Sequence, residues 1–82
     1  MSCHNDRYRL YLRDLGLQLK EYALQARQQR EQSRGSESES YYLGELHAYH
    51  GVISLIQQEA KVFEIALEEL RLDDIDPDHD LL

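Results

Sequence analysis

The stretch "SRGSESES" (33–40) is the one clear break in a sequence that otherwise favours helix throughout. Gly35 can adopt the left-handed conformation that ends a helix. The basic run "RQQR" (27–30) just before it suits a helix C-terminus, where cations meet the negative end of the helix dipole. Ser36 and Glu39 match the S-x-x-E capping box that begins a helix. A disordered low-complexity segment is the alternative, but a short polar stretch between periodic segments is typical of a turn.

Apolar residues on both sides of this break recur at alternating steps of three and four. In the first segment they are Tyr8, Leu12, Leu15, Leu19, Tyr22 and Ala26. In the second segment they are Tyr42, Leu46, Tyr49, Ile53, Ile56, Ala60, Phe63, Leu67 and Leu70. We call these two sets the seam, because this spacing lines one side of a helix and predicts packing against a neighbour at a shallow angle.

We therefore predict an all-α fold in which the chain, 1–82, forms a single helical-hairpin domain. The helices are expected over about 6–33 and 39–71, with a turn over about 34–38 that makes them antiparallel. The second helix would be roughly 50 Å long at 1.5 Å per residue.

A second apolar stripe runs along the second helix, on roughly the opposite face from the seam. We call it the outer stripe, and its members are Gly44, Ala48, Gly51, Leu55, Val62 and Ile65. The first helix likewise carries three leucines away from its seam: Leu10, Leu17 and Leu24. A helix that is apolar on two faces is normally covered on both. Since the chain is short, we predict a homodimer that forms a four-helix bundle with twofold symmetry and uses these residues as its interface.

The C-terminal segment "LDDIDPDHDLL" (72–82) contains five aspartates and Pro77, so it is expected to be an irregular acidic tail. Ile75, Leu81 and Leu82 could fold it back on the bundle or dock it elsewhere. Four of its aspartates alternate along the chain: Asp74, Asp76, Asp78 and Asp80. They lack the glycine and the glutamate of a calcium loop, so a solvated tail or a docking segment for a basic partner is the better interpretation.

Other candidate binding residues lie on the helices. His47 and His50 are three residues apart, a spacing that metal sites on helices use, but such sites need more ligands. The alternative is that both histidines flank the seam at the surface. Tyr11 and Tyr41 fall off the seam and are candidates for contact with a partner, since aromatic residues are enriched at interfaces.

Charge and motifs limit the function. Residues 1–35 carry seven basic and four acidic side chains, and residues 36–82 carry two and twelve, so the halves have formal charges of +3 and −10. An acidic surface makes nucleic-acid binding unlikely. The sequence shows no phosphate loop, nucleophile elbow or zinc-helix motif, and we expect no enzyme activity and no cofactor.

The single cysteine, Cys3, cannot form a disulfide framework and suits the cytoplasm. No stretch is long and apolar enough for a signal peptide or a membrane span.

These observations predict a small acidic, non-enzymatic protein-interaction module, such as an adaptor, regulator or assembly subunit. The second hypothesis is an acidic inhibitor of a basic site, as antitoxins, immunity proteins and nucleic-acid mimics are. The third is a metal-binding bundle centred on the two histidines.

Overall fold

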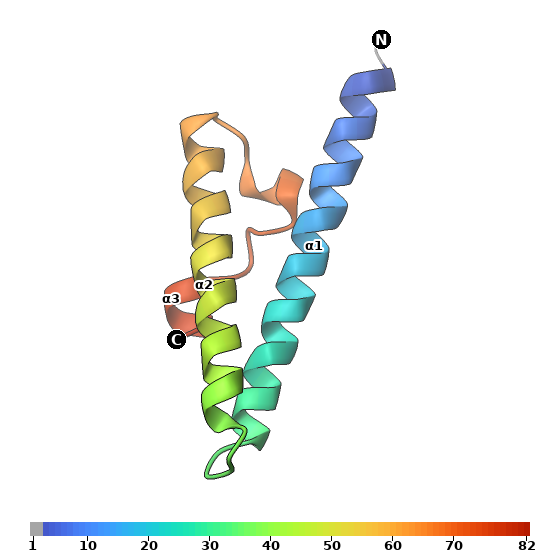
Figure 1. The fold of residues 1–82 in the computed structure, drawn as a ribbon. Helices are drawn as coiled ribbons and strands as arrows, with labels where there is room; N and C mark the ends of the chain where they lie inside the picture. The colour runs from blue at the N-terminus through green and yellow to red at the C-terminus, as the bar shows by residue number, and fades with distance from the viewer. Residues whose placement is uncertain (1–2) are drawn as a thin grey trace.

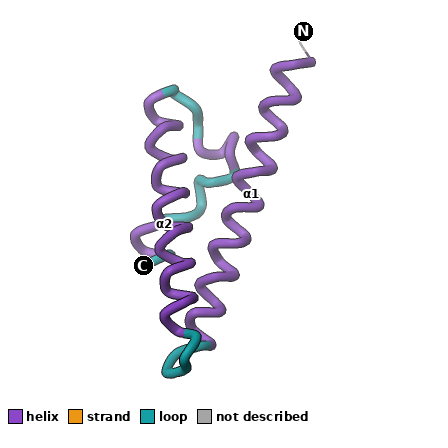
Figure 2. Tube along the Cα trace, in the orientation of Figure 1, coloured by secondary structure: helices purple, strands orange, loops and turns teal. Residues whose placement is uncertain are grey.

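A computed structural model of the chain describes residues 3–82, with side-chain surroundings from residue 6 onward. Two long helices, α1 (Cys3–Gln32) and α2 (Glu39–Val62), form an antiparallel hairpin. A short 3-10 helix, η1 (Leu67–Leu70), and a single helical turn, α3 (Pro77–Asp80), follow. The described residues form no strand (Figures 1 and 2). The predicted all-α helical hairpin is confirmed.

The turn between α1 and α2 is built differently from the expected capping box. Gly35 has a φ of +80°, the left-handed conformation that glycine adopts most readily. The Ser36 hydroxyl donates to the carbonyl oxygen of Ser33 at 2.6 Å and accepts from the backbone N–H of Ser38 at 3.2 Å. The carboxylate of Glu39 accepts from the N–H of Gly35 at 3.2 Å. Both residues therefore stabilise the turn, but neither makes the contact of the standard box.

The second helix is shorter than the sequence predicts. The prediction of helix over 39–71 is wrong beyond Val62, where α2 ends. The N–H of Ile65 donates to the carbonyl oxygen of Ala60 at 2.8 Å, five residues back, and Glu64 lies in the left-handed region with a φ of 57°. This is the arrangement of a Schellman cap, although glycine usually occupies the left-handed position.

The segment after α2 returns between the two long helices as a third layer. In Figure 1 the helices lie close together at the turn and diverge toward the other end, where residues 63–76 fill the space between them. η1 packs on α1 at Gly16, and α3 packs against α2. Leu70, Leu72, Ile75 and Leu81 are buried there. Burying such side chains stabilises by roughly 1.5–3 kcal/mol each, which outweighs the cost of ending the helix early.

The core also differs from the predicted seam. Between the long helices it contains Ala23, Ala26, Leu46, Ile53 and Ala60. Tyr8, Leu12, Leu15 and Tyr22, which the spacing assigned to the seam, are exposed. The reason is that α1 presents a narrow line of small residues to its neighbours, so its leucines and tyrosines lie beside the contact instead of in it.

Candidate functional site

An apolar groove lies between α1 and α2, with a volume of about 310 Å³. α1 contributes Leu12, Leu15, Gly16 and Leu19 to its lining, and α2 contributes Leu55, Ile56, Glu59 and Ala60. The chain after α2 adds Phe63, Ile65, Leu70 and Leu72. Glu59 is therefore the one charged residue among the twelve that line the groove.

The groove and the acidic tail occupy opposite sides of the hairpin. Successive residues of a helix are about 100° apart, which places Leu12 and Lys20 on different sides of the buried face of α1. In the same way Ile56 and Gln57 flank the buried face of α2. Leu12 and Ile56 line the groove, whereas Lys20 and Gln57 bind the tail. The tail thus covers one side of the hairpin and leaves the other open.

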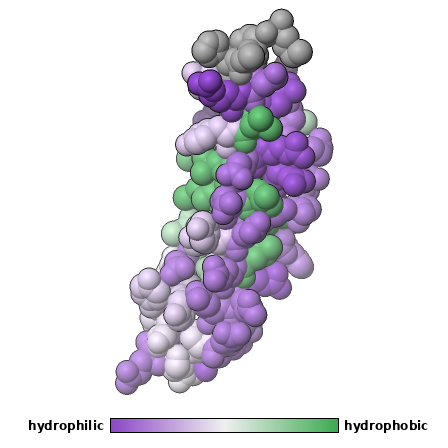
Figure 3. Space-filling view, turned by 90° about the vertical axis from the view of Figure 1, so that its right-hand side faces the viewer, coloured by the Kyte–Doolittle hydropathy of each residue, from purple (hydrophilic) through white to green (hydrophobic). Residues whose placement is uncertain are grey.

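The open side exposes large apolar side chains. Phe63 is 70% exposed, Leu55 57% and Leu12 43%. Tyr8 and Tyr22, on the same side of α1, are also exposed. Phe63, Leu55 and Leu12 also line the groove, so its edges expose apolar side chains, as interaction sites on proteins commonly do. Figure 3, which looks onto the α1 side, shows hydrophobic residues gathered along the upper part of the molecule among hydrophilic ones.

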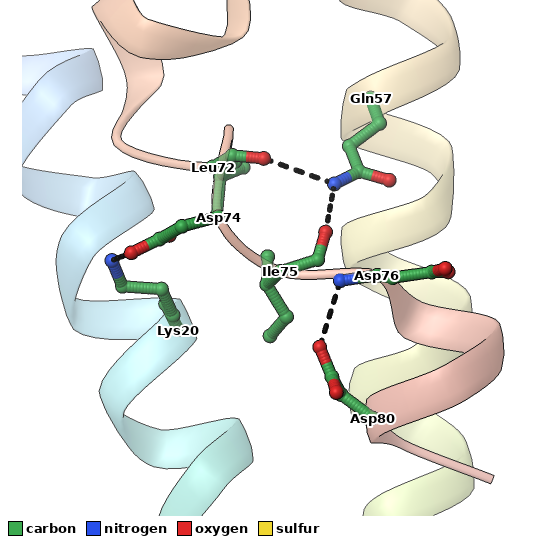
Figure 4. Close-up of polar contacts among 7 residues, drawn as sticks. All are labelled: Lys20, Gln57, Leu72, Asp74, Ile75, Asp76 and Asp80. Atoms are coloured by element: carbon green, nitrogen blue, oxygen red, sulfur yellow. Dashed lines mark hydrogen bonds and ion pairs between the residues drawn. The ribbon is translucent and has the colours of Figure 1, made fainter.

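Polar contacts hold the tail on the other side (Figure 4). The Lys20 ammonium donates to both carboxylate oxygens of Asp74, at 2.9 and 3.1 Å. The side-chain amide of Gln57 donates to the backbone carbonyl oxygens of Leu72 at 3.1 Å and Ile75 at 3.0 Å. The two Gln57 bonds satisfy backbone acceptors in a segment that has no regular structure, which fixes the path of the chain between the helices.

The remaining tail aspartates also have partners within the chain. His50 Nε2 lies 2.8 Å from Asp78 Oδ1, and Arg27 Nη1 lies 3.8 Å from Asp80 Oδ1. Asp76 caps α3 by accepting from the N–H of Asp78 at 3.2 Å. The four aspartates predicted to bind a partner therefore make contacts inside the molecule, on its own helices or within the tail.

The tail carboxyls of Asp74 and Asp80 are stabilised in their charged forms. The hydrogen bond from Lys20 is the main cause that lowers the pKa of Asp74 below its ordinary value. For Asp80 the pKa is lowered mainly by the backbone N–H of Asp76, at 2.9 Å, and then by the hydrogen bond with His79. Ionised Asp74 therefore favours the docked tail, and ionised Asp80 mainly favours the local fold of the tail around α3.

The predicted dimer residues fall on separate parts of the surface. Gly44, Ala48, Gly51, Leu55 and Val62 lie on exposed positions of α2. Ile65 does not belong with them, because α2 has already ended and this side chain packs against the core. On α1, Leu10 and Leu24 are exposed and Leu17 is half-buried. Leu10 and Leu17 line a different depression, together with Arg13, Asp14 and Arg71.

The glycines of α2 have no contact that explains them. A Cβ atom added at Gly44 or Gly51 would meet nothing within 4 Å. A Cβ at Gly16 would lie 1.8 Å from the carbonyl oxygen of Leu70. Packing inside the chain thus requires glycine at position 16 of α1, a residue that the sequence analysis did not single out, and not at the two positions of α2.

The remaining candidates lie apart from the groove. His47 is exposed, and His50 faces the tail. Within residues 6–82 no group of three or more histidine, cysteine, aspartate or glutamate side chains is arranged to hold a metal ion. Tyr11 is exposed on α1, and Tyr41 is exposed beside the turn, where its ring meets that of Tyr42 edge-on at 5.2 Å.

The groove was not predicted from the sequence, because the spacing assigns Leu12, Leu15 and Phe63 to a closed seam. A signal for it existed in "LGLQL" (15–19), where a glycine interrupts the leucines of α1 at the level of its contact with η1. Among the described residues, no helix combines the length and the apolar character needed to cross a membrane. Comparison of the chain with protein-family models, curated proteins and solved structures gave no match.

Proposed function

We propose that this protein is a small non-enzymatic interaction module that acts as a cytoplasmic homodimer, with the outer stripe of α2 as the contact between copies. The observation that supports this most directly is the open space around Gly44 and Gly51. Each glycine costs a helix roughly 1 kcal/mol relative to alanine. Two such residues on one exposed face suit the close approach of a second helix, which would place the α2 helices at the centre of a four-helix bundle.

The position of the tail favours this function over that of an electrostatic inhibitor. An inhibitor that blocks a basic site needs free carboxylates. Asp74, Asp78 and Asp80 instead lie against Lys20, His50 and Arg27 of the same chain. The tail is better explained as a structural layer that completes one side of the hairpin.

Light scattering at micromolar concentration tests the dimer. We expect twice the monomer mass for the natural chain and the monomer mass for Gly51→Leu, since a leucine would separate the two backbones. Gln25→Leu adds the same side chain to an exposed position of α1 and should leave the dimer intact. A natural chain that scatters as a monomer at this concentration would contradict the proposal.

A further inference from the structure

We propose that the groove between α1 and α2 binds an amphipathic helix of a basic partner protein. This rests on the proposed interaction function, but not on dimerisation. Of the outer stripe, Leu55 and Ile65 line the groove, whereas the other members do not. Gly44 and Gly51 take no part in lining the groove. A dimer formed through Gly44 and Gly51 would therefore leave most of one groove open on each copy.

The shape of the groove suits a helix. Its walls run from Leu12 to Leu19 on α1 and from Leu55 to Phe63, at the end of α2, a length of roughly 11–12 Å on each side at 1.5 Å per residue. This is two helical turns, the length over which a bound helix places anchors at positions i, i+3, i+4 and i+7. Leu70 and Leu72 close the space between the walls, so such a helix would rest on three apolar surfaces.

The described part of this chain offers no occupant of its own. The one segment long enough to reach, the acidic tail, is held on the opposite side by Lys20 and Gln57. Ile75 and Leu81 are already buried there. The helix that fits the groove has to come from another molecule.

The charges around the groove indicate which molecule that is. Glu59 is the only charged lining residue, and it has no ion-pair partner among the described side chains. Lys20 and Arg27 are paired with Asp74 and Asp80 of the tail. Arg9 lies beside Leu12 next to the groove, where Glu69 is its ion-pair partner. A partner helix with lysine or arginine beside its apolar face complements this acidic edge.

A second copy of this chain complements the groove less well. Its own exposed apolar side would bring another Glu59 toward the first. Like charges at a contact disfavour association. A basic helix avoids this repulsion and buries the same leucines.

Two synthetic helical peptides of roughly 18 residues, or five turns, serve as probes. Both carry leucine at i, i+3, i+4 and i+7; one has lysine and the other glutamate at the flanking positions. Fluorescence anisotropy with a labelled peptide should show binding of the lysine peptide at least about tenfold tighter than that of the glutamate peptide, and weakening with added salt. Equal binding of the two peptides, or no binding of either, overturns the proposal.

Matched variants locate the bound peptide. Leu15→Asp places a charge in the groove and should weaken the lysine peptide about tenfold or more, whereas Leu10→Asp, on the other side of α1, should have little effect. Glu59→Lys and Glu21→Lys change the net charge equally, but only the first lies in the groove. We expect the first to weaken binding several-fold more than the second. Equal losses within either pair would mean that the peptide binds elsewhere, which overturns the proposal.

Circular dichroism checks that each variant is folded. If Leu15→Asp unfolds, Phe63→Ser replaces it, since Phe63 is exposed in the turn after α2.

Light scattering separates this proposal from the dimer. If Leu15→Asp converts a dimer to a monomer while Gly51→Leu does not, the groove is occupied by a second copy and the basic-partner proposal is wrong. If Gly51→Leu is monomeric and still binds the lysine peptide, both proposals are supported independently.

Discussion

Gly16 lies in the middle of α1, where the backbone of η1 passes over it. The carbonyl oxygen of Leu70 occupies the position that a side chain would need, and the Leu72 side chain is the next neighbour. At Gly44 in α2, the place where a Cβ atom would lie is open space. The same residue type thus has a packing reason in one helix and none within the chain in the other.

Gly16→Ala should therefore destabilise the fold. The added Cβ would lie 1.8 Å from a backbone oxygen, so η1 has to move away from α1. We expect the free energy of unfolding to fall by about 1–3 kcal/mol, the usual cost of overpacking, in urea denaturation followed by circular dichroism. Gly44→Ala is the control, and at protein concentrations where the chain is monomeric it should raise the free energy of unfolding by up to about 1 kcal/mol. Equal effects of the two substitutions would contradict the packing described at Gly16.

Residue spacing predicted the inner side of α2 better than that of α1. Leu46, Ile53 and Ala60 are buried as the seam requires. On α1 the spacing selected Tyr22, whereas its neighbour Ala23 is the buried residue. A pattern of hydrophobicity ranks tyrosine and leucine above alanine and glycine, but close contact between backbones selects small residues. That preference depends on which chain segment lies opposite, and spacing alone carries no such information.

At the scale of elements, the end of α2 is where local and distant interactions compete. The spacing of Ala60, Phe63, Leu67 and Leu70 continues a helical pattern, and no glycine or proline interrupts it. The chain nevertheless turns at Glu64, whose φ is 57°. A non-glycine residue in this conformation costs about 1–2 kcal/mol. The contact of η1 with Gly16, distant in sequence, offsets that cost.

Glu64→Gly distinguishes the observed turn from a continuous helix. In the observed structure, glycine relieves the strain at this position, and we expect the free energy of unfolding to rise by about 1 kcal/mol in urea denaturation. In a helix that continued to residue 71, the same glycine would lower it by about the same amount. The sign of the change decides between the two, and Glu68→Gly, inside η1, serves as the control that should destabilise.

The elements that were predicted correctly are those whose stabilising contacts come from residues close in the sequence. Gly35 and the serines around it define the turn between the long helices, and their contacts all lie within a few residues. The return of the tail is specified by Lys20 and Gln57, which are far from it in sequence. The groove follows from that return, because η1 holds the ends of the helices apart. It could not be predicted without the tail.

At the scale of the whole molecule, the hairpin has three kinds of surface. The tail covers one side, the groove lies on the opposite side, and Gly44 and Gly51 of the outer stripe lie on a further open face of α2. A two-helix hairpin with an open side on each flank would bury little apolar surface, and chains of this size commonly need further contacts for stability. The tail supplies part of that burial and leaves two apolar surfaces for partners.

Acid should loosen the tail before it unfolds the long helices. The pKa values of Asp74 and Asp80 are lowered in the folded protein, by Lys20 and by the Asp76 N–H, respectively. A carboxyl with a lowered folded pKa stabilises the fold fully above its unfolded value of about 3.9, and that contribution is lost as the pH falls further, through the folded pKa. Between pH 6 and pH 5 the stability should therefore change little on account of these groups, and between pH 4 and pH 2 it should decline.

Urea denaturation across this pH range measures the effect, with the variant Asp74→Asn/Asp80→Asn for comparison. The variant should be less stable than the natural chain at pH 6 and should lose less stability between pH 4 and pH 2, because it has no carboxylates to protonate at these positions. Asp73→Asn removes a tail carboxylate that has no ion pair among the described residues, so it should follow the natural chain. Parallel curves for the natural chain and the double variant would mean that these two carboxylates do not hold the tail, and burial of Leu72, Ile75 and Leu81 would then be sufficient to keep the third layer in place.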